Sequence, residues 1–295
     1  GPNKYQYMRN QRRDFLRYSA LLGSGLLLAK LPLGASDFFE VAKKNKYGVQ
    51  LWTLRDILGK DTWNILSKLG KAGYRSIESF EGPNGVYWGK SPKEFSAFLK
   101  DNGMSMPSIH CNVFENFDKK VAEAAESGVQ HVLCPWLGPQ KTIDDFKKAA
   151  DRFNDMGAIC KKNGMRFGYH NHDYSFKILD GEIPQQVLMD QTDATLVDFE
   201  MDIYWVVTAG ADPIDWLSRY PNRFRLAHVK DRSKNPGSDN GQNSVVLGTG
   251  SIDFAKILKA GQKNGVKQWI VEQEANYGAG PLESCIASID YLKKM

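Results

Sequence analysis

The sequence lacks several features that mark other classes of protein. Its four cysteines show no C-x-x-C spacing, so buried free thiols are expected, although the sequence leaves their pairing open. No Pro/Gly/Ser-rich linker divides the chain, and no G-x-G-x-x-G motif follows the first apolar segment. These absences favour one large domain over two and argue against an open dinucleotide-binding sheet.

The formal charge of +5 lies outside the main body of the chain. Residues 1–35 contain six Lys or Arg and one Asp, so the remainder is neutral. A neutral body has no general attraction for a polyanion, and we expect no nucleic-acid partner. Apolar residues make up 42% and charged residues 25%, which is typical of a globular protein and excludes a disordered or multi-span membrane chain.

The N-terminal segment predicts export. RRDFLR at 12–17 resembles the twin-arginine signal and precedes an apolar run at 20–29. That run is shorter than the ~20 residues of a membrane span, so no stable membrane anchor is expected. An amphipathic helix is the alternative. We divide the chain into a signal (1–35), a linker (36–46) and a folded body (47–295), and expect a periplasmic or otherwise exported protein.

Short apolar segments alternate with amphipathic stretches throughout the folded body. Eight such units in about 250 residues predict a single (β/α)8 TIM barrel in the α/β class. Several strands follow a glycine suited to the left-handed conformation that ends a helix: Gly73, Gly103, Gly128, Gly164 and Gly265. The expected strands are 47–52, 76–80, 106–111, 131–135, 166–170, 195–202, 224–230 and 268–272.

The expected helices have recognisable starts. Ser91 and Glu94 form a capping box around a proline. Thr142 precedes two acidic residues, and Pro281 opens the last helix. A further helix is expected at 251–264, with an apolar stripe at spacings of three and four.

Charged residues occur at the ends of strands five to eight, where a strand buried on both faces should be apolar. Side chains alternate along a strand, and neighbours such as Tyr169 and Met201 take the face toward the helices. The charged residues are therefore expected inside the barrel, where their burial is costly unless they are paired or bind a cation. The pairs that share a face are His170 with His172, Glu200 with Asp202, His228 with Lys230, and Glu272 with Glu274.

This convergence at the carboxyl ends of neighbouring strands predicts a divalent metal site at the barrel mouth. For each residue alone, a hydrogen-bonded core position is the alternative. Glu78 and His110, which end strands two and three, extend the polar ring as substrate contacts or as a solvated rim. Trp136 and Trp205 would provide aromatic walls for a sugar ring, or core packing.

In this order the motifs resemble those of the xylose isomerase-like TIM barrel superfamily, which includes sugar phosphate isomerases and epimerases, inosose dehydratases and endonuclease-IV-type enzymes. The resemblance extends from Tyr47 to the C-terminus. It is carried by GVQLWTLRD (48–56), GYRSIE (73–78), GYHNHD (168–173), DIYW (202–205), HVKD (228–231), LGTGSID (247–253) and VE (271–272).

The resemblance implies one divalent metal, held in other members by Glu, Asp, His and Glu on strands five to eight. Asp202, His228 and Glu272 match this set, but His170 stands at the strand-five position, and a shifted register would place His172 there. In the epimerases the carboxylates of strands five and eight also act as acid and base. This departure implies that an imidazole takes that role, or that the chemistry is not a symmetrical epimerisation.

The implied function is a metal-dependent isomerase or epimerase of a sugar or keto-sugar that works through an enediolate, or a keto-polyol (inosose-type) dehydratase. A mixed nitrogen and oxygen ligand set favours Mn, Co, Zn or Fe over Mg. A non-catalytic sugar-binding barrel is the alternative of another class, and an endonuclease-type site would need more than the five histidines present. A small sugar or polyol is the expected partner, and a homo-oligomer is left open. Glu272 or His172 is expected as the base, Lys230 as oxyanion partner or acid, and Glu78, His110, Trp136, Glu200 and Trp205 as substrate contacts.

Overall fold

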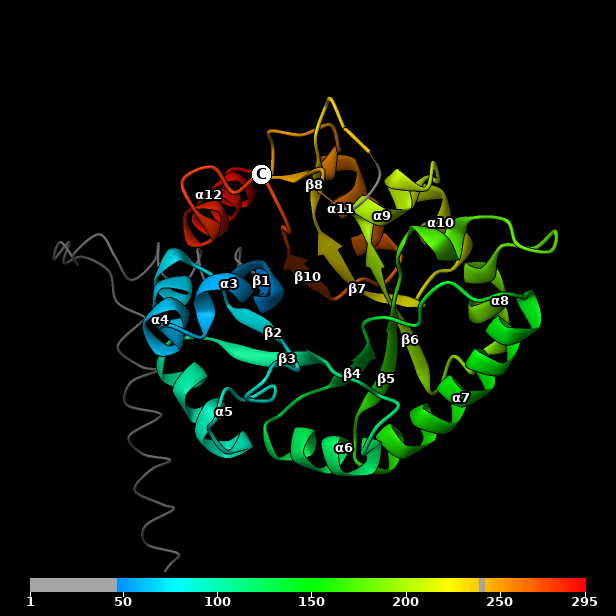
Figure 1. The fold of residues 1–295 in the computed structure, drawn as a ribbon, viewed down its shortest axis with the longest axis horizontal. Helices are drawn as coiled ribbons and strands as arrows, with labels where there is room; N and C mark the ends of the chain where they lie inside the picture. Colours follow the sequence, from blue (N-terminus) through cyan, green and yellow to red (C-terminus); the bar gives the residue numbers. More distant parts are fainter. Residues whose placement is uncertain (1–46, 239–241) are drawn as a thin grey trace, which may run out of the picture. The chain divides into compact units, whose positions relative to one another are not determined.

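Eight parallel strands close into a barrel in the computed structural model, which describes residues 47–238 and 242–295 (Figure 1). The predicted signal and linker lie outside the described residues. The strands are β1 (Tyr47–Gln50), β2 (Ser76–Phe80), β3 (Ser105–His110), β4 (His131–Cys134), β5 (Arg166–His170), β6 (Val197–Asp202), β7 (Phe224–Val229) and β10 (Gln268–Val271). Their order around the barrel is β1-β10-β7-β6-β5-β4-β3-β2, which confirms the predicted TIM barrel.

The helices between the strands cover the outside of the barrel (Figure 1). Phe153, for example, packs its ring against Phe167 and Tyr169, with ring centroids 5.1 and 5.4 Å apart. None of the helices in the described ranges is long and apolar enough to cross a membrane. The helical elements are η1 (Leu51–Leu54), α3 (Arg55–Leu58), α4 (Thr62–Ala72), α5 (Pro92–Asp101), α6 (Phe117–Glu126), α7 (Ile143–Lys162), η2 (Asp173–Phe176), α8 (Pro184–Gln191), α9 (Ile203–Thr208), α10 (Pro213–Arg219), α11 (Phe254–Lys263) and α12 (Pro281–Lys293).

Local signals set most of the helix ends as predicted. The capping box at Ser91 is formed, and the Thr142 side chain accepts from the backbone N–H of Asp145. The five predicted glycines all have φ between 72° and 119°, where a side chain would be strained. The start of the helix expected at 251–264 is wrong, because the Asp253 side chain caps it and α11 begins at Phe254.

A small hairpin follows β7 and was not predicted. It pairs β8 (Asp231–Arg232) with β9 (Ser244–Val245). The Asp231 carboxylate accepts backbone N–H groups of Gly248 and Gly250 at 3.0 and 2.9 Å. A Cβ at Gly250 would overlap this carboxylate, so the turn requires glycine there.

Three layers fill the inside of the barrel. A small apolar cluster of Leu133, Leu226 and Ile270 forms a plug that is separate from the main core between strands and helices. Charged side chains lie toward both barrel ends. Cys111, Cys134, Cys160 and Cys285 are buried free thiols.

Candidate metal centre

The site begins with β6, all of whose residues are buried. Asp198, Glu200 and Asp202 share the inward face of this strand, each one closer than the last to the carboxyl end of the barrel. At its end, Asp202 is held from two sides: Asn171 Oδ1 accepts its backbone N–H at 3.0 Å, and its own Oδ1 accepts the backbone N–H of Trp205 at 3.2 Å to cap α9. These bonds fix the carboxylate and leave its second oxygen free.

The free oxygen, Asp202 Oδ2, is buried and has no hydrogen-bond partner. His170 Nε2 and Lys230 Nζ lie 3.6 Å from it, and His228 Nδ1 lies 3.7 Å from it. These distances are too long for hydrogen bonds. Glu272 Oε2 completes this group, which we call the mouth cluster, at 3.2 Å from His228 Nδ1. The ligand atoms of Asp202, His228 and Glu272 lie within 4.8 Å of one another.

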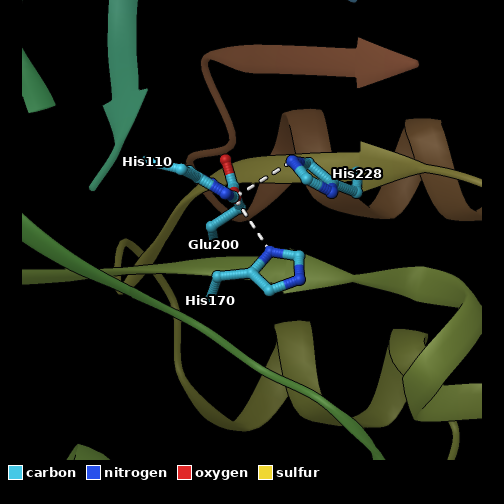
Figure 2. A group of neighbouring side chains, drawn as sticks. All are labelled: His110, His170, Glu200 and His228. Carbon is cyan, nitrogen blue, oxygen red and sulfur yellow. Dashed lines mark hydrogen bonds and ion pairs between the residues drawn. The ribbon is translucent and has the colours of Figure 1, made fainter. Parts of the chain in front are cut away.

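Two further carboxylates, Glu200 and Glu78, which we call the lower layer, contact the imidazoles of the mouth cluster, and Figure 2 shows Glu200 among His110, His170 and His228. Glu200 Oε1 lies 2.9 Å from His170 Nδ1, 3.1 Å from His228 Nε2 and 2.7 Å from His110 Nε2. Glu78 Oε1 also contacts His228 Nε2, at 2.7 Å. A carboxylate that accepts one ring N–H leaves the other ring nitrogen as a metal ligand. The layer therefore turns His170 Nε2 and His228 Nδ1 toward the mouth.

The buried carboxyl groups are ionised despite their burial. Burial alone would raise the pKa of Glu272, but Lys230 and His228 hold it well below its usual range. Burial likewise opposes the low pKa of Asp202, which Lys230 and the nearby imidazoles maintain. For Glu200, the opposing effect of burial is outweighed by His228 and His110. Ionised oxygens are the form that binds a cation.

The pKa values of two imidazoles outside the ligand set are shifted in opposite directions. Burial lowers the pKa of His110, but Glu78 and Glu200 outweigh it and raise this pKa to about 10. Burial and the neighbouring His170 hold the pKa of His172 well below its usual value. This shift favours the neutral form of the His172 ring, which keeps a lone pair on one nitrogen.

A cavity of about 560 Å³ opens above the mouth cluster. The predicted residues that line it are His110, Trp136, His170, His172 and Glu272. His172 packs edge to face on Trp136, with ring centroids 4.7 Å apart. The structure therefore brings the expected base candidates and one aromatic wall into the same space.

Four residues predicted to contact or act on the substrate lie elsewhere among the described residues. Glu78 and Glu200 are fully buried beneath the imidazoles, which they contact directly. Lys230 is fully buried and paired with Asp202, Glu272 and Glu274. Trp205 is buried against the Lys230 ammonium. None of the four lines the cavity, so direct substrate contact by them stays a prediction that the cavity wall does not support.

Sequence reasoning missed the residues that hold the lower layer. Gln50 Nε2 donates to Glu78 Oε1 at 2.8 Å, and Ser108 Oγ donates to Glu78 Oε2 at 2.5 Å. Gln50 ends β1, so the rule that placed charged strand ends in the barrel would have found it. Asn171 was missed because its role is to bond the Asp202 backbone, which residue type alone does not reveal.

The comparisons with known proteins agree with this architecture. A family model described as xylose isomerase-like TIM barrel matches residues 66–295. The chain is 31% identical to an inosose dehydratase of Clostridium perfringens over 165 residues, which cover 51% of this chain and 55% of that protein. The match thus spans about half the length of this relative, whereas a match at 26% identity covers 93% of the inosose dehydratase of Lacticaseibacillus casei.

Solved structures extend the likeness over most of the chain. A sugar phosphate isomerase/epimerase from Parabacteroides distasonis is 29% identical, with a TM-score of 0.75, and the match covers 90% of this chain and 96% of that one. A structure described as containing a bound zinc atom is 16% identical and shares the fold, with a TM-score of 0.70 over 84% of this chain and 98% of that one. The chain belongs to the xylose isomerase-like TIM barrel family.

Proposed function

We propose that this chain is a divalent-metal-dependent isomerase or epimerase of a sugar or keto-sugar. The observation that carries the proposal is Asp202 Oδ2, a buried ionised oxygen without a hydrogen bond that faces three nitrogens at 3.6 to 3.7 Å. Its ion-pair partner Lys230 lies at 3.6 Å, and a buried charged acceptor that makes no hydrogen bond is costly inside a protein. A cation in this gap would offset the cost, so the residues fit a metal.

His170 Nε2, Asp202 Oδ2, His228 Nδ1 and Glu272 would hold the ion. Two nitrogens and two carboxylates favour Mn, Co, Zn or Fe over Mg. When bound, the ion would polarise adjacent carbonyl and hydroxyl oxygens and stabilise an enediolate. Lys230 balances the charge of the surrounding carboxylates instead of touching substrate, as its ion pairs with Glu272 and Glu274 indicate.

His172 is the base that the placement favours. It lines the cavity, and its Nδ1 is buried without a hydrogen-bond partner. Its ring is held among those of Trp136, Tyr174 and Trp205. Glu272 also lines the cavity, but its Oε2 already contacts His228 and Lys230. A proton acceptor must keep a free lone pair, and His172 makes none of the ion pairs that engage Glu272.

Keto-polyol dehydration is the second candidate. It is supported by the similarity to an inosose dehydratase and by His170, which stands where the epimerases place their second acid/base carboxylate. Elimination of water needs a base for the carbon-bound proton and an acid for the leaving hydroxyl. Two matched carboxylates are not required for it.

Incubation with candidate keto-sugars in deuterated water, followed by NMR, tests both candidates. Deuterium exchange with a change of configuration supports the epimerase, and loss of water supports the dehydratase. Chelation should abolish the reaction and added Mn should restore it. Asp202→Asn should be inactive, whereas Asp155→Asn, an exposed aspartate on α7, should match the wild type. A chain that purifies without metal and turns over nothing would be a sugar-binding barrel.

We also propose that residues 1–35 direct export by the twin-arginine route, because RRDFLR precedes a short apolar run. Replacing Arg12 and Arg13 by Lys should keep the protein in the cytoplasm. Unchanged export of this variant would contradict the proposal.

A further inference from the structure

The cavity above the mouth cluster is larger than one sugar ring requires. Its volume is about 560 Å³. A six-carbon polyol fills the space of about six water molecules, roughly 180 Å³ at ~30 Å³ each. The cavity can therefore hold a second ring beside the one that reacts.

The extra space lies on the side of the barrel away from the metal ligands. Those ligands come from β5, β6, β7 and the end of β10, whereas the remaining cavity wall follows β2, β3 and β4, which are consecutive in the barrel. Phe80, Asn112 and Trp136 stand at these three strand ends. A ligand ring over the mouth cluster would leave this second half of the cavity open.

Two exposed tryptophans border the cavity and are held in place. Trp136 is 54% exposed, yet its ring packs on His172 and on Tyr174 at 5.2 Å. Trp52 is 40% exposed, with Phe80 at 5.0 Å and the Arg55 guanidinium at 4.9 Å from its ring. Large aromatic faces that are both exposed and fixed are typical of ligand-binding surfaces.

The charge of the wall favours an uncharged ligand. No Lys or Arg of the described ranges lines the cavity, whose ionisable wall residues are Glu81, Glu272, Glu274 and three imidazoles. Cations close to the wall are already engaged: Lys120 Nζ contacts Glu81 at 3.0 Å, Lys230 is buried, Arg55 donates to two backbone carbonyls and to Tyr277, and His110 is paired with Glu78 and Glu200. Phosphate sites normally present Arg, Lys or helix N–H donors. In the second half of the cavity, away from the mouth cluster, a phosphate would face the Glu81 carboxylate and no Lys or Arg of the lining.

We propose that the substrate is an uncharged two-ring molecule, a keto-sugar glycoside and not a sugar phosphate. One ring lies over the mouth cluster, and the second lies against Trp136 at the ends of β3 and β4. This inference rests on the proposed function only for the choice of the ring that reacts. The shape and the charge of the site do not depend on it.

Binding titrations on the Mn-loaded chain test the inference without turnover. The probes are glucose, glucose 6-phosphate, cellobiose and phenyl β-glucoside, followed by calorimetry and tryptophan fluorescence. Cellobiose and phenyl β-glucoside should bind at least about fivefold more tightly than glucose, the gain expected from one aromatic contact. Glucose 6-phosphate should bind no more tightly than glucose.

Trp136→Ala should abolish the gain from the second ring, measured as the ratio of the affinities for cellobiose and glucose within the same variant. Ile178→Ala, an exposed apolar residue outside the cavity wall, is the matched control and should retain the gain. The inference is overturned by a gain below fivefold, by tighter binding of glucose 6-phosphate than of glucose, or by a gain that survives Trp136→Ala. Failure of the metal chemistry is separate, because it appears as absent deuterium exchange while this binding pattern persists.

Discussion

The two ends of β6 place buried aspartates in opposite situations on the same face of one strand. Near the amino end, Asp198 Oδ1 accepts from Arg166 Nη2 at 2.7 Å and Oδ2 pairs with His131 Nε2 at 2.8 Å. At the carboxyl end, Asp202 Oδ2 has no hydrogen bond although three cationic or imidazole nitrogens surround it. Buried charge alone therefore does not mark a functional site in this barrel. We propose that unmet hydrogen-bonding capacity at the mouth marks it instead.

The largest expected effect comes from breaking the mouth end. Asp202→Asn should lower the activity found by deuterium exchange by at least about 10³-fold, because it removes a ligand to the ion that stabilises the developing charge. Asp198→Asn should remain within about tenfold of the wild type under conditions where both are folded. Equal activity losses in the two variants would remove the functional distinction between the strand ends.

For the free energy of unfolding, we expect the larger effect from Asp198→Asn and the smaller one from Asp202→Asn. Asp198→Asn should lower the free energy of unfolding by about 3 kcal/mol, because it leaves Arg166 and His131 without their partner. In metal-free protein, Asp202→Asn should cost less than half as much, since it removes an oxygen that makes no hydrogen bond. Urea unfolding of the two chelator-treated variants measures the difference. A larger loss for Asp202→Asn would show that its carboxylate is a structural ion-pair member.

Glu200, midway along the same face, sharpens the comparison. Glu200→Gln should weaken metal binding about 10- to 100-fold, because it loosens the orientation of His170 and His228. Competition with a chelating dye measures the affinity. Glu126→Gln, which changes an exposed glutamate on α6, controls for the charge. An unchanged affinity in Glu200→Gln would mean that the lower layer does not orient the ligands.

The smallest effect is the pH dependence of the amino end. Burial raises the pKa of Asp198, but His131 and Arg166 outweigh it and hold this pKa below the ordinary value. A carboxyl whose folded pKa is lowered stabilises the fold above its unfolded pKa, ~3.9, and this contribution is lost as the pH falls through the folded value. The stability gap between wild type and Asp198→Asn should therefore be full at pH 7 and shrink below about pH 4. A gap that grows on acidification would contradict this sign.

Much of the fold was predictable because each unit carries its own signals. Glycines at the helix ends and the alternation of strand and helix predicted all eight strands, with ends that differ from the structure by at most two residues. Strand parity also predicted that His170, Asp202, His228 and Glu272 would meet, since side chains at even spacing share one face.

The alternation of side chains along a strand did not predict how deep inside the barrel each inward side chain lies. Asp198, Glu200 and Asp202 have the same parity, yet one pairs at the base, one supports imidazoles and one faces the mouth. Glu78 and Lys230 were assigned to substrate for the same reason, although neighbouring strands cover them. The position of Trp205 depends on the turn into α9 that Asp202 caps, which a strand pattern does not describe.

Metal titration of the chelator-stripped chain tests the central claim most directly. Calorimetry with Mn should give one equivalent bound to the wild type and to Asp198→Asn, and none to Asp202→Asn. At a hundredfold excess over the dissociation constant, the ion should raise the free energy of unfolding of the wild type by ~2.7 kcal/mol. Wild-type protein that binds no divalent ion, or Asp202→Asn that binds it as tightly as the wild type, would contradict the account.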